Sequence, residues 1–120
     1  MRFHKQSKVH IPGQQRGNCL ATALACIFDL EIDDIPQFEN LMDKPGDEWL
    51  KAYTDWLLER GLEIATSKEP PEGYALAIGK SPRAINHCVV ALNGELIHDP
   101  HPDNSFLVAV NFYEFFVEAE

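Results

Sequence analysis

The first half of the chain carries hydrophobic residues at helical spacing. Over 19–29 the apolar side chains recur at intervals of three and four residues and form one face, made of Leu20, Ala21, Leu24, Ala25 and Phe28. Asn18 is a suitable N-cap for this helix, and Gly17 frees the turn before it. A second amphipathic helix is predicted over 47–60, with Gly61 as its stop. Its apolar face consists of Trp49, Leu50, Tyr53, Trp56 and Leu57.

The second half of the chain predicts strands. Short apolar runs bounded by turn residues indicate strands over 62–66, 74–78, 86–91, 95–99 and 106–110. The aromatic stretch 111–117 is expected to finish the core as a last strand or helix, and would suggest an interface if it were exposed. Helices followed by a mainly antiparallel sheet predict an α+β fold. With 120 residues, 45% of them hydrophobic, the chain suits a single domain spanning 1–120.

The formal net charge of −9 argues against nonspecific binding to nucleic acid or to anionic membranes, which require a basic surface. The charge is unevenly distributed along the chain. Eight acids lie within 29–48, and the basic residues that precede them are Arg2, Lys5, Lys8 and Arg16. This basic arm is expected either to stay solvated, or to meet an acidic protein partner or the acidic middle of its own chain.

No apolar run is long enough for a signal peptide or a membrane span, so we expect a cytoplasmic protein. The three cysteines, Cys19, Cys26 and Cys88, are an odd number without the spacing of a disulfide framework. In a reducing compartment they are expected to be free thiols.

Cys19 is a candidate for chemistry because it begins the first predicted helix. Unpaired amides and the helix dipole stabilise a thiolate at this position, and a histidine partner lowers the thiol pKa further. His87 and Asp99, on two neighbouring predicted strands, complete the parts of a cysteine nucleophile with its base and orienting group. The alternative is that Cys19 is a small buried side chain like Cys26, two turns further along the same face.

The register of the hairpin decides whether His87 and Asp99 meet. Its turn contains Asn93-Gly94, and a two-residue loop would send the two side chains to opposite faces of the sheet. A three-residue loop with a bulge instead pairs Ala91 with Glu95 and places His87 directly across from Asp99. We predict the three-residue loop.

The two-residue loop would favour a different site. His98 would then share a face with His87, and the segment 98–103 is crowded with possible ligands, namely His98, Asp99, His101 and Asp103. This composition suits zinc or another divalent metal. A third interpretation treats 99–103 as a rigid polar turn stiffened by its prolines.

Three segments of the chain carry a family resemblance. Gln14-Gln15-Arg16-Gly17-Asn18-Cys19 opens a helix, His87-Cys88-Val89-Val90 begins a strand, and His98-Asp99-Pro100 ends the next one. In this order they resemble the papain-like cysteine peptidase superfamily, and most closely the peptidases that remove double-glycine leaders from bacteriocin precursors. The similarity spans 14–103. It implies a papain-like fold, in which a helix carrying the nucleophile packs on an antiparallel sheet carrying the base and its orienting group.

By this resemblance Cys19 is the nucleophile, His87 the general base and acid, and Asp99 the carboxylate that sets the imidazole tautomer. Gln15 or Gln14 would donate its side-chain amide to the oxyanion, together with the Cys19 backbone amide. The implied reaction is acyl transfer on a peptide or a small amide through a thioester, with no cofactor.

The role of Arg83, just before the histidine strand, is open: it either anchors a substrate carboxylate or balances nearby surface acids. Two alternative functions of the whole chain also remain open. A catalytically inactive domain of the same family would bind a leader peptide or a partner protein through its cleft. A metal-dependent hydrolase would use His87, His98 and His101.

Overall fold

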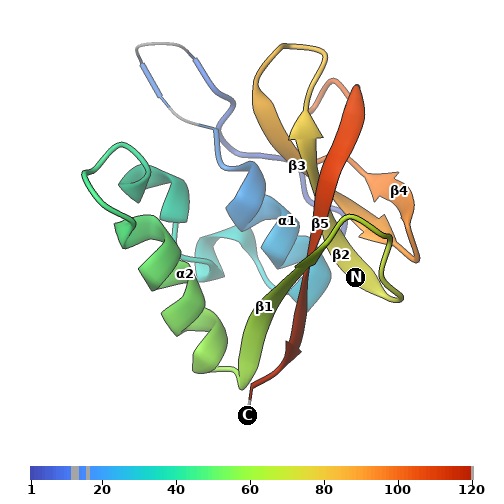
Figure 1. Cartoon of the computed structure of the whole chain (residues 1–120). Coiled ribbons are helices and arrows are strands. Elements are labelled where there is room, and N and C mark those ends of the chain that lie inside the picture. The colour runs from blue at the N-terminus through green and yellow to red at the C-terminus, as the bar shows by residue number, and fades with distance from the viewer. Residues whose placement is uncertain (12–13, 16, 120) are drawn as a thin grey trace.

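The computed structural model describes residues 1–11, 14–15 and 17–119. Within these residues the chain forms two α-helices, two short 3-10 helices and five strands (Figure 1). In chain order they are α1 (Cys19–Phe28), η1 (Ile32–Asp34), η2 (Phe38–Leu41), α2 (Glu48–Leu58), β1 (Leu62–Ser67), β2 (Tyr74–Lys80), β3 (Asn86–Leu92), β4 (Glu95–His98) and β5 (Ala109–Glu118).

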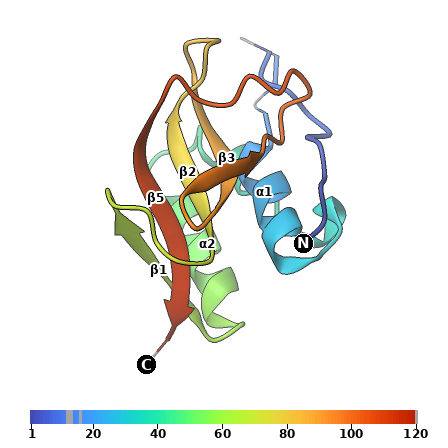
Figure 2. The same cartoon turned by 90° about the vertical axis from the view of Figure 1, so that its right-hand side faces the viewer.

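The strands form one sheet in the order β1-β5-β2-β3-β4, and every neighbouring pair is antiparallel. α1 packs against β3 and α2 packs against β1, so both helices cover the same face of the sheet (Figures 1 and 2). The predicted α+β class is therefore confirmed. In the part of the chain that the structure describes, no helix has the length and apolar character needed to cross a bilayer.

The main core lies between the helices and the sheet, and it includes the fully buried side chains of Leu24, Leu57 and Leu76. A smaller cluster, built around Val89 and Tyr113, lies on the opposite face. Strand β3 is thus buried on both faces, which explains its uninterrupted apolar sequence.

The C-terminal part of the sheet differs from the prediction. Phe106 has a φ of 58°, which is incompatible with a strand, and β5 begins only at Ala109. The strand expected over 106–110 is therefore wrong in its first residues. The aromatic stretch 111–117 belongs to β5, which lies between β1 and β2. It is an inner strand that completes the core.

The N-terminal arm, residues 1–8, crosses from α1 to the loop after β4. The Met1 ammonium lies 3.1 Å from the Asp29 carboxylate, and Arg2 forms an ion pair with Glu31. Lys5 Nζ donates to the Asp99 carbonyl at 2.8 Å. Of the basic residues expected to meet the acidic middle of the chain, Arg2 does so through Glu31, and Arg16 lies outside the described residues.

Candidate active site

The hairpin of β3 and β4 carries two of the predicted site residues. Its turn has two residues, because Leu92 pairs with Glu95 and both Asn93 and Gly94 have positive φ, of 52° and 85°. These angles are those of a type I′ turn, which matches the twist of the flanking strands. The predicted three-residue loop is therefore wrong.

A bulge one step further along the hairpin changes which side chains share a face. Ala91 pairs with Leu96, but the next pair joins Val90 to His98, so Ile97 is an extra residue in β4. Because side chains alternate along a strand, one extra residue moves every later side chain to the opposite face. The bulge thus cancels the effect of the shorter loop.

As a result, His87 and Asp99 share a face and are joined directly. The His87 Nε2–H donates to Asp99 Oδ1 at 2.7 Å, and both side chains are almost fully buried. Asp99 also accepts hydrogen bonds from the backbone N–H groups of His101 and Phe106, at 2.9 Å each. Burial raises the pKa of Asp99, but these three donors outweigh it and hold the pKa below its usual value.

The other nitrogen of the His87 ring is available to the thiol of Cys19. Burial lowers the pKa of His87, but the hydrogen bonds with Asp99 and then with Cys19 outweigh it and raise the pKa to about 9. Since Nε2 is bonded to Asp99, Nδ1 is the atom left for the sulfur. The imidazole is therefore expected to be protonated at neutral pH.

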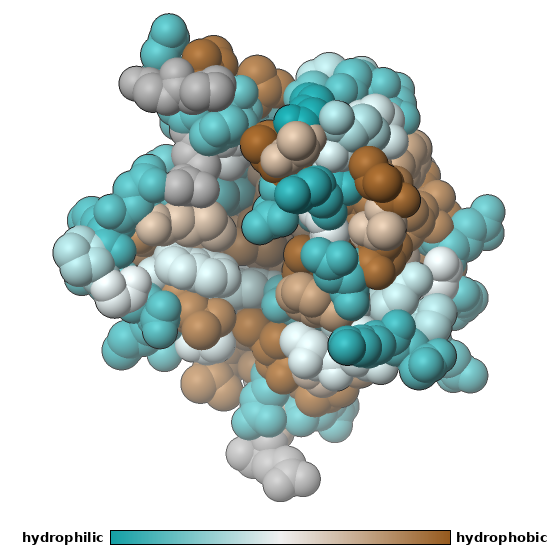
Figure 3. All heavy atoms as spheres, turned by 45° about the horizontal axis from the view of Figure 1, so that its top comes forward, coloured by the Kyte–Doolittle hydropathy of each residue, from teal (hydrophilic) through white to brown (hydrophobic). Residues whose placement is uncertain are grey.

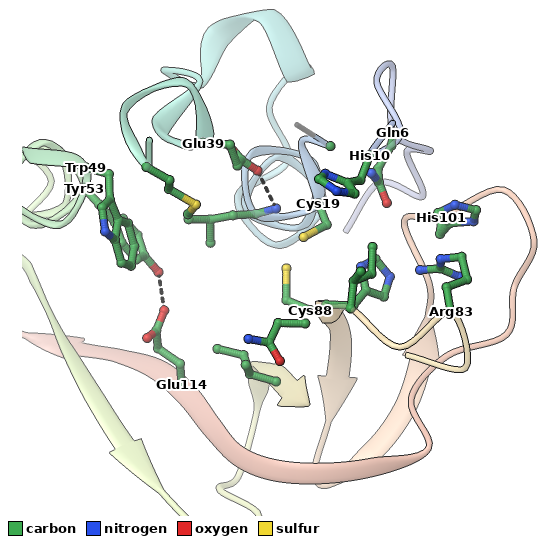
Figure 4. A pocket seen from close by; sticks show the side chains of 17 residues that line it. Gln6, His10, Cys19, Glu39, Trp49, Tyr53, Arg83, Cys88, His101 and Glu114 are labelled. Atoms are coloured by element: carbon green, nitrogen blue, oxygen red, sulfur yellow. Dashed lines mark hydrogen bonds between the residues drawn. The ribbon is translucent and has the colours of Figure 1, made fainter. Parts of the chain in front are cut away.

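Cys19 is the first residue of α1, and its sulfur contacts two residues of β3. A hydrogen bond from the Cys88 thiol holds the pKa of Cys19 well below its usual value, and the hydrogen bond and charge of His87 lower it further, against the effect of burial. Figure 4 shows the two sulfur atoms facing each other. Cys26, by contrast, is buried and its pKa is raised by burial. Together these shifts favour a thiolate at Cys19 and an imidazolium at His87.

Glu39, from η2, caps α1, the helix that begins at Cys19. Its Oε2 accepts hydrogen bonds from the backbone N–H of Leu20 at 2.8 Å and of Ala21 at 3.2 Å. Asn18 occupies the N-cap position, but its side chain makes no hydrogen bond to the helix. Instead, the Asn18 side chain bonds to the N-terminal arm and to Gln37. The capping group is thus supplied from a distant part of the chain.

A cavity of about 520 Å³ opens at Cys19. Figure 3 shows this face of the molecule hollowed between the helices and the sheet. Cys19 and Cys88 lie near the middle of the cavity wall (Figure 4), and His87 also lines the cavity. One end is lined by side chains of η2, α2 and β5, and the other by the N-terminal arm and the loops that flank β3 and β4.

Neither glutamine predicted for the oxyanion is among the described residues that line this cavity. Gln14 and Gln15 are exposed, and Gln15 Nε2 donates to the Val9 carbonyl at 2.7 Å. Gln6, from the N-terminal arm, lines the cavity instead. A Cβ added at Gly17 would lie 3.0 Å from Gln6 Nε2, so the missing side chain leaves room for this amide beside Cys19.

Arg83 lies in the cavity wall and is only partly paired. Its Nη1 donates to Asp103 Oδ2 at 2.7 Å and to Ser105 Oγ at 2.9 Å. Its Nε and Nη2 are buried without a partner in the described chain. Arg83 thus balances a nearby acid, which is one of its two expected roles. Its free N–H donors also suit the other expected role, the binding of a substrate carboxylate.

The residues of the metal interpretation do not form one group: the rings of His87 and His101 lie with their centroids 6.2 Å apart, but His98 is separated from them. His98 pairs with Val90, and its Nε2 donates to the His4 carbonyl at 2.5 Å. His87 lies on the other face and is bonded to Asp99. Among residues 1–11, 14–15 and 17–119, no three His, Cys, Asp or Glu side chains are placed to hold a metal ion.

Cys88 and Glu39 are site residues that were not predicted from the sequence. Alternation along β3 directs Cys88 to the opposite face from His87, toward α1, and this signal was available in the sequence. No local pattern marks Glu39, because its partners are the amides of a helix eighteen and nineteen residues earlier.

Comparisons with protein-family models, with curated proteins and with solved structures find no match to this chain. What the site can do is therefore inferred from the chemistry of its side chains.

Proposed function

We propose that this chain is a cysteine-dependent hydrolase or acyl transferase of papain-like fold, acting on an amide or peptide bond through a thioester at Cys19. The placement of His87 between Asp99 and Cys19 carries the proposal. One ring nitrogen donates to a buried carboxylate at 2.7 Å, and the other hydrogen-bonds the thiol that begins α1. This order of groups activates a thiol as a nucleophile and fixes the tautomer of its base.

In the first half-reaction the Cys19 thiolate attacks the carbonyl carbon, and the carbonyl electron pair moves to oxygen. The Cys19 backbone N–H has no hydrogen-bond partner among the described residues, so it can donate to this oxyanion. One N–H of Gln6 Nε2 donates to the Lys8 carbonyl at 2.8 Å, so its other N–H is left as a second donor, in the role that the family resemblance gave to Gln14 or Gln15. His87 then gives its proton to the leaving nitrogen, the C–N bond breaks, and a thioester remains.

In the second half-reaction water, or an acceptor amine, attacks the thioester. Neutral His87 takes the proton of the attacking group, and Cys19 leaves as the thiolate. Asp99 keeps the ring oriented in both steps and stabilises the imidazolium each time it forms. A free Cys19 thiol requires reducing conditions, in keeping with a cytoplasmic location.

The substrate would be a peptide or a small amide. The unpartnered Nε and Nη2 of Arg83 suit a carboxylate group of that substrate, bound on the side of the cavity near the N-terminal arm.

The first test is the rate of Cys19 alkylation by iodoacetamide as a function of pH, followed by peptide mapping. Peptide mapping reports Cys19 separately from the other cysteines, so Cys88 need not be replaced. This matters because Cys88 contacts the nucleophile. Buried Cys26 in the same sample is the internal reference. We expect a titration well below the free-thiol pKa of about 8.5, shifted upward in His87→Ala. A Cys19 titration near that of a free thiol and indifferent to His87 would overturn the mechanism and leave a peptide-binding module.

The second test is acyl transfer itself. On incubation with p-nitrophenyl acetate, the Cys19 peptide is expected to gain one acetyl group and then lose it, with continued release of p-nitrophenolate. His87→Ala should slow both steps. Acetylation at Cys26 as fast as at Cys19 would show that the labelling is not site-directed.

A further inference from the structure

Acidic and basic side chains line opposite ends of the cavity, on either side of Cys19. Two carboxylates line the part of the cavity away from Arg83: Glu114 lies beside Tyr53 and Trp49, and Glu39 lies at the start of α1 (Figure 4). At the other end lies Arg83, the one lysine or arginine among the described residues of the lining. The acidic end therefore contains no basic side chain from the described chain.

Glu39 has a carboxylate oxygen that the fold does not use. The residue is only 3% exposed, and capping of α1 occupies Oε2 alone. Oε1 is buried in the described structure without any hydrogen-bond partner, and Glu39 lines the cavity. A buried carboxylate oxygen without a donor is costly, so its retention is explained if a ligand supplies the donor.

Glu114 and the aromatic rings face the same space. Glu114 projects from the inner strand β5, and its Oε2 accepts a hydrogen bond from the Tyr53 hydroxyl at 2.7 Å. Trp49, one turn before Tyr53 on α2, is partly buried and also lines the cavity. Aromatic faces beside carboxylates form the setting in which proteins bind organic cations.

We propose that this acidic end is a subsite for a cationic side chain of the substrate, an ammonium or guanidinium group, held by Glu39 and Glu114 against Trp49 and Tyr53. The proposal rests on the proposed function, because it places the cation next to the acyl group that Cys19 receives. Glu39 is bonded to the amide of Leu20, the residue that follows the nucleophile.

The ionisation of the two acids agrees with this assignment. Burial, and after it the nearby charge of Cys19, raise the pKa of Glu39 to about 7. Burial also raises the pKa of Glu114. A bound cation would supply the compensating charge that the two carboxylates lack.

The test uses reagents that differ only in charge. N-Aminobutyl and N-guanidinobutyl chloroacetamide carry a cation at the end of a short chain, and N-pentyl chloroacetamide is their neutral counterpart of similar length. The rate of Cys19 alkylation is measured by peptide mapping for each reagent and is divided by the rate with iodoacetamide. We expect at least one cationic reagent to react about tenfold faster than the neutral one.

Substitutions of the two acids locate the effect. Glu39→Gln keeps an oxygen to cap α1, and Glu114→Gln keeps an acceptor for Tyr53, so each is expected to fold. Either change should bring the cationic-to-neutral rate ratio close to one. Glu118→Gln, an exposed acid on the same strand, is the matched control and should keep the wild-type ratio.

The two proposals fail in different ways. If iodoacetamide detects an activated thiolate but both cationic reagents react no faster than the neutral one, the subsite is wrong and the proposed function stands. A preference that survives both Glu39→Gln and Glu114→Gln also overturns the subsite. If Cys19 titrates as an ordinary thiol, the proposed function fails, whether or not the cationic reagents react faster than the neutral one.

Discussion

His87 Nε2 and Asp99 Oδ1 lie 2.7 Å apart, although the turn that joins their strands would by itself send the two side chains to opposite faces. The extra residue Ile97 in β4 restores the shared face. The orientation of the imidazole thus depends on one bulge, and the state of Cys19 depends on the imidazole.

Replacement of Asp99 by Asn should lower the pKa of His87 from about 9. An amide carries no negative charge and has one oxygen, so it cannot accept all three of the hydrogen bonds that Asp99 receives. We also expect a loss of about 1–3 kcal/mol in the free energy of unfolding. NMR titration of the His87 ring measures the pKa. Asp103→Asn, at a partly exposed acid, is the control. An unchanged His87 pKa in Asp99→Asn would contradict the role given to this bond.

Replacement of Cys88 by Ala should raise the pKa of Cys19. The hydrogen bond from the Cys88 thiol lowers this pKa, and alanine cannot donate it. The pH midpoint of Cys19 alkylation is therefore expected to move upward, with less reactivity at neutral pH. Cys26→Ala, which removes a cysteine outside the cavity, should leave the midpoint in place. A midpoint that stays unchanged in Cys88→Ala would show that the contact between the thiols has no effect on ionisation.

Replacement of Glu39 by Gln should make the protein more stable than the wild type at alkaline pH. In the wild type the pKa of Glu39 rises from 4.5 to about 7 on folding. The neutral acid is favoured in the folded state, so the free energy of unfolding falls as pH increases through this interval, by about 3 kcal/mol in all. Gln does not titrate and avoids this loss.

Urea unfolding at about pH 5 and about pH 8 measures the effect. The stability of Glu39→Gln relative to the wild type should increase between the two conditions. Glu118→Gln, at an exposed acid, should show no such change. If the difference in the free energy of unfolding between Glu39→Gln and the wild type is the same at both pH values, ionisation of Glu39 does not destabilise the folded state.

Replacement of Gly79 by Ala should disrupt the sheet beside the site. Gly79 pairs with His87 across β2 and β3, and an added Cβ would lie 2.1 Å from the Ala109 carbonyl oxygen. Backbone atoms must move to relieve this contact, so we expect a cost of about 3 kcal/mol or more. Gly46→Ala is the matched control. Gly46 has a φ of 78° but open space around it, so only about 1 kcal/mol is expected there. Thermal unfolding of both variants compares them directly, and equal losses would refute the steric argument.

Much of the fold could be predicted from local patterns. The helix that begins at Cys19 follows from apolar spacing and from the glycine before it, and the structure places its first residue there. Short apolar runs between turn residues predicted strands over 62–66, 74–78 and 86–91, and the structure forms them at Leu62–Ser67, Tyr74–Lys80 and Asn86–Leu92. These patterns are local because hydrogen bonding and burial repeat with the period of the element itself.

Other features arise only from contacts between distant segments. Phe106 was expected to begin a strand, but its amide instead donates to Asp99 and its φ is positive. Gln6 replaces Gln14 and Gln15 in the cavity because the N-terminal arm folds back along α1 and the loop after β4. No spacing in the sequence carries this information.

The sequence by itself determined the helix that bears Cys19 and the α+β class, since each depends on patterns of residues close together in the chain, whereas it permitted both loops at Asn93-Gly94. The tertiary structure decided the rest of the site. The bulge at Ile97 sets the face of Asp99, and η2 supplies Glu39 to the start of α1. Both depend on how complete elements pack against one another, because a side chain is positioned by everything that contacts it and most of those contacts are remote in sequence.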